Sequence, residues 1–327
     1  MRMAAIRTIE QYVEEILQQL TDADYDSLTS SCDTLEKMKF SSKLKHKLNY
    51  WRVMQCLGEI GSDRLVGFLI KVDKLSCKCH LKMNFTCLMR LFLESMCNIR
   101  VIKRFSEHQL KIVPVLYRGV RQSEDSNLTA LCLEAILRLL YVGRTDSVEF
   151  FVKYGLMKDI FLEIRSKCAS RVFSLHAINV LLTSSQLLLS VSVCGTENIR
   201  KQVARSSAYK LFREKVLRML DSSSHKCSIL QLHRNFLEIN KVLSDEKVAL
   251  EAFKNWDPKE KLNDLQEQDQ VYIFCSSPSC RKIYGECGKF RYCGACRLAR
   301  YCTEACQKEH WKKGHKDSCQ RARTDIG

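Results

Sequence analysis

The sequence predicts a mostly α-helical chain that ends in a small cysteine-rich segment. The 327 residues include only 3 prolines and 12 glycines, fewer than the tight turns of a many-stranded fold require. Apolar residues recur at helical spacing along most of the chain. Eight of the 18 cysteines fall between Cys275 and Cys319, so the composition changes near the C-terminus.

The composition limits the classes of protein to consider. A hydrophobic content of 46% excludes disorder throughout, and the net charge of +16 makes an anionic partner a hypothesis to weigh. The first residues carry charge in every window where a secretory signal would need an apolar core. We therefore expect a cytoplasmic or nuclear protein, or one found in both compartments, with reduced cysteines.

The first helix is expected from a row of apolar residues on one face: Ile9, Val13, Ile16, Leu17 and Leu20. The basic run KMKFSSKLKHKLNYWR (37–52) places lysines at four-residue intervals beside a stripe of Phe40, Leu44 and Leu48. The pattern favours the solvated face of one amphipathic helix, with a phosphate-binding or acidic-partner surface as the alternative.

Weak internal repeats appear further along the chain. The stretch CLMRLFLE (87–94) aligns with CLEAILRLL (132–140) at a spacing of 45 residues. This is the period of armadillo and HEAT arrays, whose units bury their apolar faces against their neighbours. Residues 127–164 resemble one armadillo repeat, with a long helix, a turn and two helices around Gly155. An irregular helical bundle is the alternative.

The longest uncharged stretch, 172–196, is long enough to cross a bilayer, but polar residues interrupt its middle at 183–186. Two buried helices joined by a polar turn explain it better, and we expect no membrane partner. Residues 256–270 are almost free of apolar residues and predict a solvated helix or linker. The predicted domains are therefore an armadillo-like helical region at 1–270 and a C-terminal segment at 271–327.

The C-terminal segment offers four close pairs of metal ligands: Cys275 with Cys280, Cys293 with Cys296, Cys302 with Cys306, and His315 with Cys319. Zinc takes four nitrogen or sulfur ligands in a tetrahedron, and one turn of chain can supply two of them. Four pairs predict two zinc ions. A segment this short buries little core and needs such ions to fold, and ligand sets filled by protein make them structural.

The spacings C-x4-C, C-x2-C, C-x3-C and H-x3-C occur in this order, with Tyr301 before Cys302 and with Gln307 and Trp311 in the run CQKEHW. This segment resembles the MYND zinc finger. Spacing alone leaves open whether the pairs combine consecutively or alternately, and the resemblance implies alternation. The implied ligands are Cys275, Cys280, Cys302 and Cys306 for one zinc ion, and Cys293, Cys296, His315 and Cys319 for the other.

Two residues compete with the implied ligands. Cys287 lies between the first two pairs, but Cys280 gives the more compact loop with Cys275. His310 precedes the tryptophan, whereas His315 stands one helical turn from Cys319. We therefore favour Cys280 and His315.

The resemblance implies a non-enzymatic adaptor that binds a proline-containing peptide of a protein partner, with Gln307 and Trp311 lining the groove and a role in transcriptional regulation. Trp311 is also interpretable as a core residue of the finger. The sequence lacks the motifs of nucleotide-binding enzymes, serine hydrolases and HExxH metalloproteases, and no SET-type methyltransferase pattern accompanies the finger. The alternative function is a basic nucleic-acid-associated zinc protein, which the dispersed charges support less well.

Overall fold

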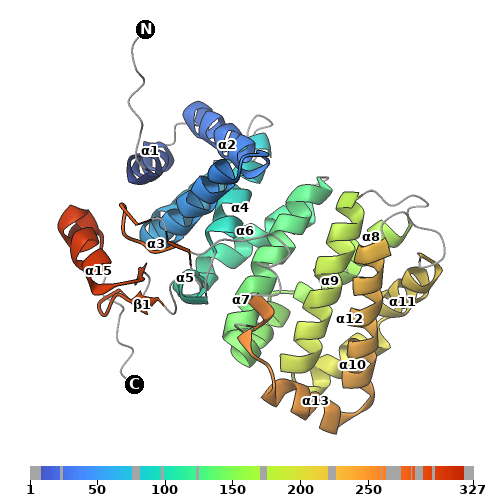
Figure 1. The fold of residues 1–327 in the computed structure, drawn as a ribbon. Coiled ribbons are helices and arrows are strands. Elements are labelled where there is room, and N and C mark those ends of the chain that lie inside the picture. Colours follow the sequence, from blue (N-terminus) through green and yellow to red (C-terminus); the bar gives the residue numbers. More distant parts are fainter. Residues whose placement is uncertain are drawn as a thin grey trace. The chain divides into compact units, whose positions relative to one another are not determined.

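The computed structural model describes residues 9–22, 25–75, 82–96, 99–122, 125–169, 175–219, 226–258, 260–262, 274–280, 282–283, 290–296 and 299–319. Helices dominate these residues, as the sequence predicts (Figure 1). The chain divides into two compact units: residues 1–108 with 263–327, and residues 109–262. The composition of the chain changes near residue 270. That this position also separates two independently folding parts stays a prediction.

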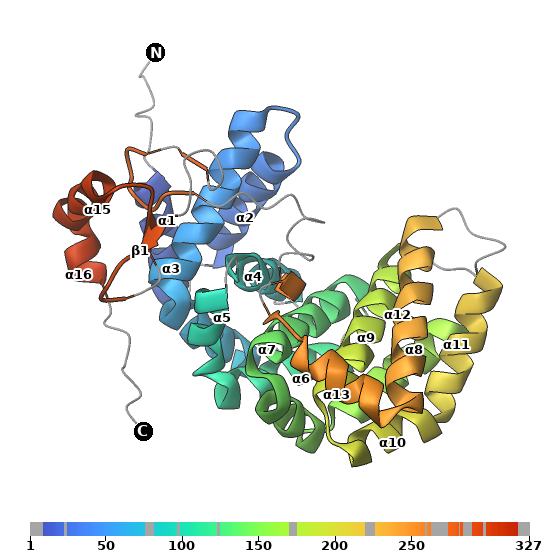
Figure 2. The same cartoon turned by 60° about the horizontal axis from the view of Figure 1, so that its bottom comes forward.

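The N-terminal residues that the structure describes in the first unit form five helices: α1 (Ile9–Asp22), α2 (Tyr25–Lys39), α3 (Leu44–Leu75), α4 (Lys82–Ser95) and α5 (Ile99–Ser106). The long helix α3 packs against α1, α2, α4 and α5 (Figure 2). Its close approach to α4 depends on Gly58, where an added Cβ would lie 2.2 Å from the carbonyl oxygen of Ser95. The same unit holds β1 (Arg291–Tyr292), β2 (Arg300–Tyr301), α15 (Glu304–His310), the π-helical turn η2 (Trp311–His315) and α16 (Lys316–Ser318).

The basic run 37–52 does not form the single helix that its spacing predicts. It spans the end of α2, a turn at residues 40–43 and the start of α3. The Ser41 hydroxyl accepts a hydrogen bond from the Lys43 amide at 3.2 Å and contacts His46 Nδ1 at 3.0 Å. Serine side chains compete in this way for backbone groups and favour helix ends over helix interiors.

The second unit contains eight helices among its described residues: α6 (Gln109–Gln122), α7 (Ser126–Lys153), α8 (Leu156–Ala169), α9 (Leu175–Cys194), α10 (Glu197–Arg205), α11 (Ser207–Met219), α12 (Lys226–Ser244) and α13 (Glu246–Lys254). Helix α7 is broken at Arg144, whose φ is 48°, and Gly155 has a φ of 99°. Residues 127–164 thus show the long helix, break and two shorter helices expected of them. A repeating armadillo or HEAT architecture stays a prediction.

The expected polar turn at residues 183–186 is wrong, because α9 runs without a break from Leu175 to Cys194. Three serines of the helix, Ser185, Ser190 and Ser192, donate hydrogen bonds to carbonyl groups of the preceding turn. Ser185 donates to the Leu182 carbonyl at 2.7 Å and accepts from Asn235 of α12 at 2.7 Å. Buried hydroxyls bonded to the preceding turn allow a helix to continue through them.

Two helices, 126–153 and 177–194, are long and apolar enough to cross a membrane by length and composition, with 61% and 72% of their most apolar windows buried in the structure. The core helices of a soluble protein pass the same test.

The stretch 256–270, expected to be a solvated helix or linker, begins with a buried residue. Trp256 is buried against Tyr141, and its carbonyl accepts from Arg144 at 2.5 Å, so the second unit extends to Leu262.

Candidate metal centre

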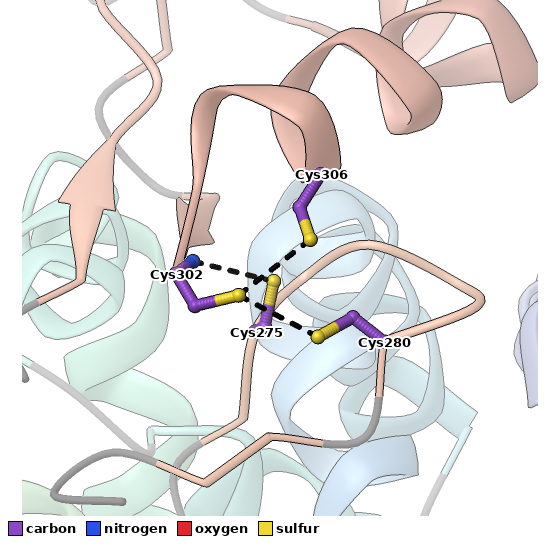
Figure 3. Close-up of side chains that lie close together, drawn as sticks. All are labelled: Cys275, Cys280, Cys302 and Cys306. Carbon is purple, nitrogen blue, oxygen red and sulfur yellow. Dashed lines mark hydrogen bonds between the residues drawn. The ribbon is translucent and has the colours of Figure 1, made fainter. Parts of the chain in front are cut away.

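The first ligand group gathers four cysteine sulfurs from two parts of the finger: Cys275, Cys280, Cys302 and Cys306. The sulfurs all lie within 4.8 Å of one another, and Figure 3 shows them pointing toward a common centre. Cys302 Sγ lies 3.6 Å from Cys280 Sγ and 3.5 Å from Cys306 Sγ. The Cys302 amide lies 3.5 Å from Cys275 Sγ and donates a hydrogen bond to it.

The second group gathers three sulfurs and one imidazole: Cys293, Cys296, His315 and Cys319. Cys293 Sγ lies 3.8 Å from Cys319 Sγ, and Cys296 Sγ lies 3.6 Å from His315 Nε2. His315, Cys293 and Cys296 are buried. The two groups alternate along the chain, so the structure brings the ligand pairs together in the cross-braced order.

These distances fit a tetrahedral zinc site. With Zn–S bonds of about 2.3 Å, the sulfurs of a regular tetrahedron lie about 3.8 Å apart. A sulfur and an imidazole nitrogen on the same ion lie about 3.5 Å apart, given a Zn–N bond of about 2.0 to 2.1 Å. The observed separations of 3.5 to 3.8 Å match both values.

A two-stranded hairpin explains why the groups alternate. Strands β1 and β2 are antiparallel, with Tyr292 opposite Arg300. Cys293 follows β1 directly and its amide donates to the Ala299 carbonyl at 2.8 Å, whereas Cys302 follows β2. Because adjacent strands run in opposite directions, the loop between them supplies Cys293 and Cys296 to the second group. The far end of β2 supplies Cys302 to the first group.

Local signals place the remaining ligands on the C-terminal helices. Thr303 caps α15 by accepting from the Cys306 amide at 3.2 Å, which fixes the turn that holds Cys306. Gly314 has a φ of 125°, a conformation that glycine adopts without the strain of a Cβ. This turn of the backbone brings His315 and Cys319 back toward the hairpin.

Glu309 fastens α15 to the first ligand loop. Its carboxylate accepts hydrogen bonds from the hydroxyls of Ser277 and Ser279 and from Lys313 at 2.7 Å. The Lys313 ammonium and then the two hydroxyls lower the pKa of Glu309 to about 2. The carboxylate is therefore charged at neutral pH.

Of the two competing residues, Cys287 lies outside the described residues. His310 lies outside both ligand groups, stacked on His315 with ring centroids 4.7 Å apart. Its Nδ1 lies 3.1 Å from the hydroxyl of the buried Tyr301. Burial, followed by the nearby His315 and Arg52, lowers the pKa of His310 to about 4, so its ring is neutral at physiological pH.

The predicted peptide-binding pair lies on the C-terminal helix of the finger. Gln307 is half-buried within α15, and the Trp311 amide donates to the Gln307 carbonyl, so the two residues stand one helical turn apart. Trp311 is 40% exposed, and its ring packs edge-to-face with the His315 ring, with the ring centroids 5.9 Å apart. Trp311 therefore packs on the finger through its contact with His315 while part of its surface remains exposed, and its role in peptide binding stays a prediction.

Three polar side chains of α3 hold the finger against the N-terminal helices. Arg52 donates to the carbonyl oxygens of Ser277 and Pro278 at 2.7 and 2.8 Å. Gln55 pairs with both backbone groups of Phe274, each at 2.9 Å. All of these contacts fall on the loop that carries Cys275 and Cys280.

The third side chain, Glu59, is buried among donors. It accepts from the Ser276 hydroxyl at 2.8 Å and from Gln55 at 3.0 Å, and Arg300 Nε lies 3.7 Å away. Burial raises the pKa of Glu59 to about 7, against the opposing effects of Arg300, Ser276 and Gln55.

These three residues are not predicted from the sequence. They are 217 or more residues from their partners in the finger, and their spacing at positions 52, 55 and 59 matches one face of any helix. The only available signal was polar side chains interrupting an apolar helix face next to Trp51 and Met54, which are buried.

The match to a curated protein covers a small part of the chain. Ubiquitin C-terminal hydrolase 15 of Oryza sativa subsp. japonica is 44% identical over an alignment of 52 residues, and the match covers 14% of this chain. The chain thus spans about 5% of the length of that relative. The crystal structure of an engineered protein has 14% sequence identity and a TM-score of 0.39, with 73% of this chain and 94% of that chain covered.

One family model matches the segment that holds both ligand groups. The MYND finger model matches residues 275–319, which begin and end at the first and last cysteine ligands. The MYND finger is a protein-interaction module. The C-terminal segment of the chain therefore matches a MYND finger with two Cys/His metal-binding groups, whose chemistry is consistent with zinc.

Proposed function

We propose that this chain is a non-enzymatic adaptor whose finger holds two structural zinc ions and binds a proline-containing peptide of a protein partner. The observation that carries the proposal is the half-exposed Trp311, one helical turn from Gln307 on a helix that also supplies a metal ligand. A partly apolar and partly polar surface on a rigid element can order an extended peptide at little cost in its own conformational entropy.

Zinc is the ion that the donor sets favour. Seven thiols and one imidazole are typical of structural zinc sites, and four protein ligands leave no position for water or substrate. Burial raises the pKa of the Cys319 thiol to about 12. A bound cation opposes this shift by stabilising the thiolate, so loading the finger releases protons and becomes stronger as pH rises.

The helical region serves in this proposal as an armadillo-like scaffold that carries the finger. We place the protein in the cytoplasm, the nucleus or both, with transcriptional regulators as the class of partner. Nucleic-acid binding is the weaker candidate, because the finger has no C2H2 spacing and no reading helix of the kind that enters a major groove.

The test is selection of a displayed random-peptide library on the zinc-loaded full chain, followed by titration of the selected peptides. We expect the selected peptides to contain proline. Gln307→Ala should weaken their binding by about 1 to 2 kcal/mol, the usual cost of truncating a contributing interface residue. Its zinc content should stay unchanged, because Gln307 is not a ligand.

Lys308→Ala is the matched control. Lys308 is the next residue on the same helix, is exposed, and pairs with Glu304 at 2.7 Å on another face. Its loss should change peptide affinity by less than about 0.5 kcal/mol. If Gln307→Ala and Trp311→Phe both bind the selected peptides as the unsubstituted chain does, the peptide groove is not at this helix and the proposal fails.

A further inference from the structure

The turn between α2 and α3 exposes two large apolar side chains. Phe40, directly after α2, is 70% exposed, and Leu44, the first residue of α3, is 58% exposed. Phe40 is the most exposed large apolar side chain in the described part of the chain. Figure 2 shows this turn at the end of the two helices that it joins. We call residues 37–47 the basic turn.

Lysines surround the two apolar side chains. Lys43 and Lys45 flank Leu44 and are exposed. Lys37 precedes Phe40 by three residues and Lys47 follows Leu44 by three, a spacing that places helical side chains on a shared face. Within the described residues, none of these four ammonium groups lies within ion-pair distance of a carboxylate.

Neighbouring carboxylates offset the charge of one lysine of the basic turn, Lys39, and leave the four lysines named above unpaired among the described residues. The sequence has no Asp or Glu from Lys37 to Gly58. Glu36 pairs with Arg90 at 2.6 Å, and Glu94 of α4 pairs with Lys39 at 2.7 Å. Glu94 thus offsets the charge of Lys39, whereas Glu36 is engaged with a cation outside the turn.

We propose that the basic turn binds the surface of an anionic lipid bilayer, with Phe40 and Leu44 entering the interface and the lysines remaining among the headgroups. Aromatic and aliphatic side chains beside lysines are the combination that gives interfacial membrane binding. A turn at the end of two helices presents its side chains outward, which suits a flat and deformable surface. An extended acidic peptide would satisfy the lysines but leave most of the apolar surface in water.

This proposal is separate from the finger and from its peptide ligand. The expectation of no membrane partner concerns membrane-spanning segments. Peripheral binding needs none, because the protein remains on one side of the bilayer.

The test is co-sedimentation of the zinc-loaded full chain with vesicles of phosphatidylcholine alone and with 30% phosphatidylserine. We expect binding to the mixed vesicles only. Phe40→Ser with Leu44→Ser should weaken it by about tenfold or more. Lys43→Glu with Lys45→Glu should weaken it by about 25-fold or more, since one lysine near an anionic surface contributes about fivefold.

Two matched controls separate the basic turn from the overall charge of +16. Leu250→Ser removes a leucine that is 52% exposed on α13, and Lys210→Glu with Lys254→Glu reverses two exposed charges on the second unit. Both controls should bind like the unsubstituted chain, and circular dichroism should show every variant folded. Absence of binding to the mixed vesicles, or equal weakening by test and control variants, overturns the proposal. The first result would favour an acidic protein segment at this turn.

Discussion

Arg52 Nη2 on α3 lies 2.7 Å from the carbonyl oxygen of Ser277, which is inside the first metal-ligand loop and 225 residues further along the chain. Together with Gln55 and Glu59, this contact makes the finger part of the N-terminal helical unit. The stability of α3 and the occupancy of the first metal site should therefore depend on each other. Anything that binds only the folded finger stabilises the elements that fold with it.

We expect two zinc ions per chain by native mass spectrometry. Cys302→Ser should reduce the number to one or destroy the finger, because it removes a thiolate from the first group. Cys287→Ser is the comparison that tests the ligand assignment, and it should retain both ions. A single ion in the unsubstituted chain, or loss of an ion in Cys287→Ser, would contradict the assignment.

Replacement of Arg52 should destabilise the first unit. Arg52→Ala removes two hydrogen bonds from a charged donor, one to the buried carbonyl of Ser277 and one to the half-buried carbonyl of Pro278, and should lower the free energy of unfolding by about 2 to 3 kcal/mol. Arg64→Ala is the matched control on the same helix, since its exposed ion pair with Glu14 contributes less than about 1 kcal/mol. Urea unfolding of both variants with saturating zinc gives the comparison.

Removal of zinc should affect the two units differently. Because the finger packs on α3, a chelator should speed hydrogen exchange in α3 as well as in the finger, whereas α9 and α12 of the second unit should keep their protection. Unchanged exchange in α3 after chelation would show that the finger contributes nothing to the stability of that helix.

Two glycines of α3 should respond oppositely to alanine. Gly58→Ala places a Cβ 2.2 Å from the Ser95 carbonyl oxygen, so α3 and α4 must separate, and the free energy of unfolding should fall by about 1 to 3 kcal/mol. At Gly67 an added Cβ meets nothing within 4 Å, and alanine should raise that free energy by up to about 1 kcal/mol. Thermal unfolding of the two variants is the measurement. A Gly58→Ala protein more stable than the Gly67→Ala protein would contradict the close packing of α3 against α4.

The buried carboxyl of Glu59 should make stability fall as pH rises. Its pKa is raised from 4.5 to about 7 in the folded protein, so the folded state holds a proton that the unfolded state releases. The contribution of Glu59 to the free energy of unfolding is complete below pH 4.5 and is lost as pH rises through about 7. Its full size is about 3 kcal/mol, from a shift of about 2.5 pKa units.

Zinc binding should make the free energy of unfolding rise with pH, which opposes the effect of Glu59. The measurement is therefore a difference in this free energy between two proteins. The free energy of unfolding of Glu59→Gln is subtracted from that of the unsubstituted chain at each pH between 5 and 8, with saturating zinc. The metal dependence is common to both proteins and cancels. A difference that stays constant over this range would mean that the pKa of Glu59 is not raised.

Features that depend on neighbouring residues can be predicted from the amino-acid sequence. The spacing of cysteines within each ligand pair reflects how far one turn of chain reaches around a metal ion, and the helical periodicity reflects which face a helix buries. The pairs and most of the helices were therefore predictable. The alternation of the pairs came from the resemblance, since loops of either order would fit.

Features that depend on distant partners emerge only from the folded chain. Ser185 lies within a continuous helix because Asn235 and the preceding turn bond its hydroxyl, and local sequence predicted a turn there. Phe40 is exposed because the chain turns at Ser41, where a helix face was expected. Arg52 and Glu59 meet the finger across more than 200 residues. Such contacts leave no periodic signal, because their free energy comes from burying matched polar groups that only the complete fold brings together.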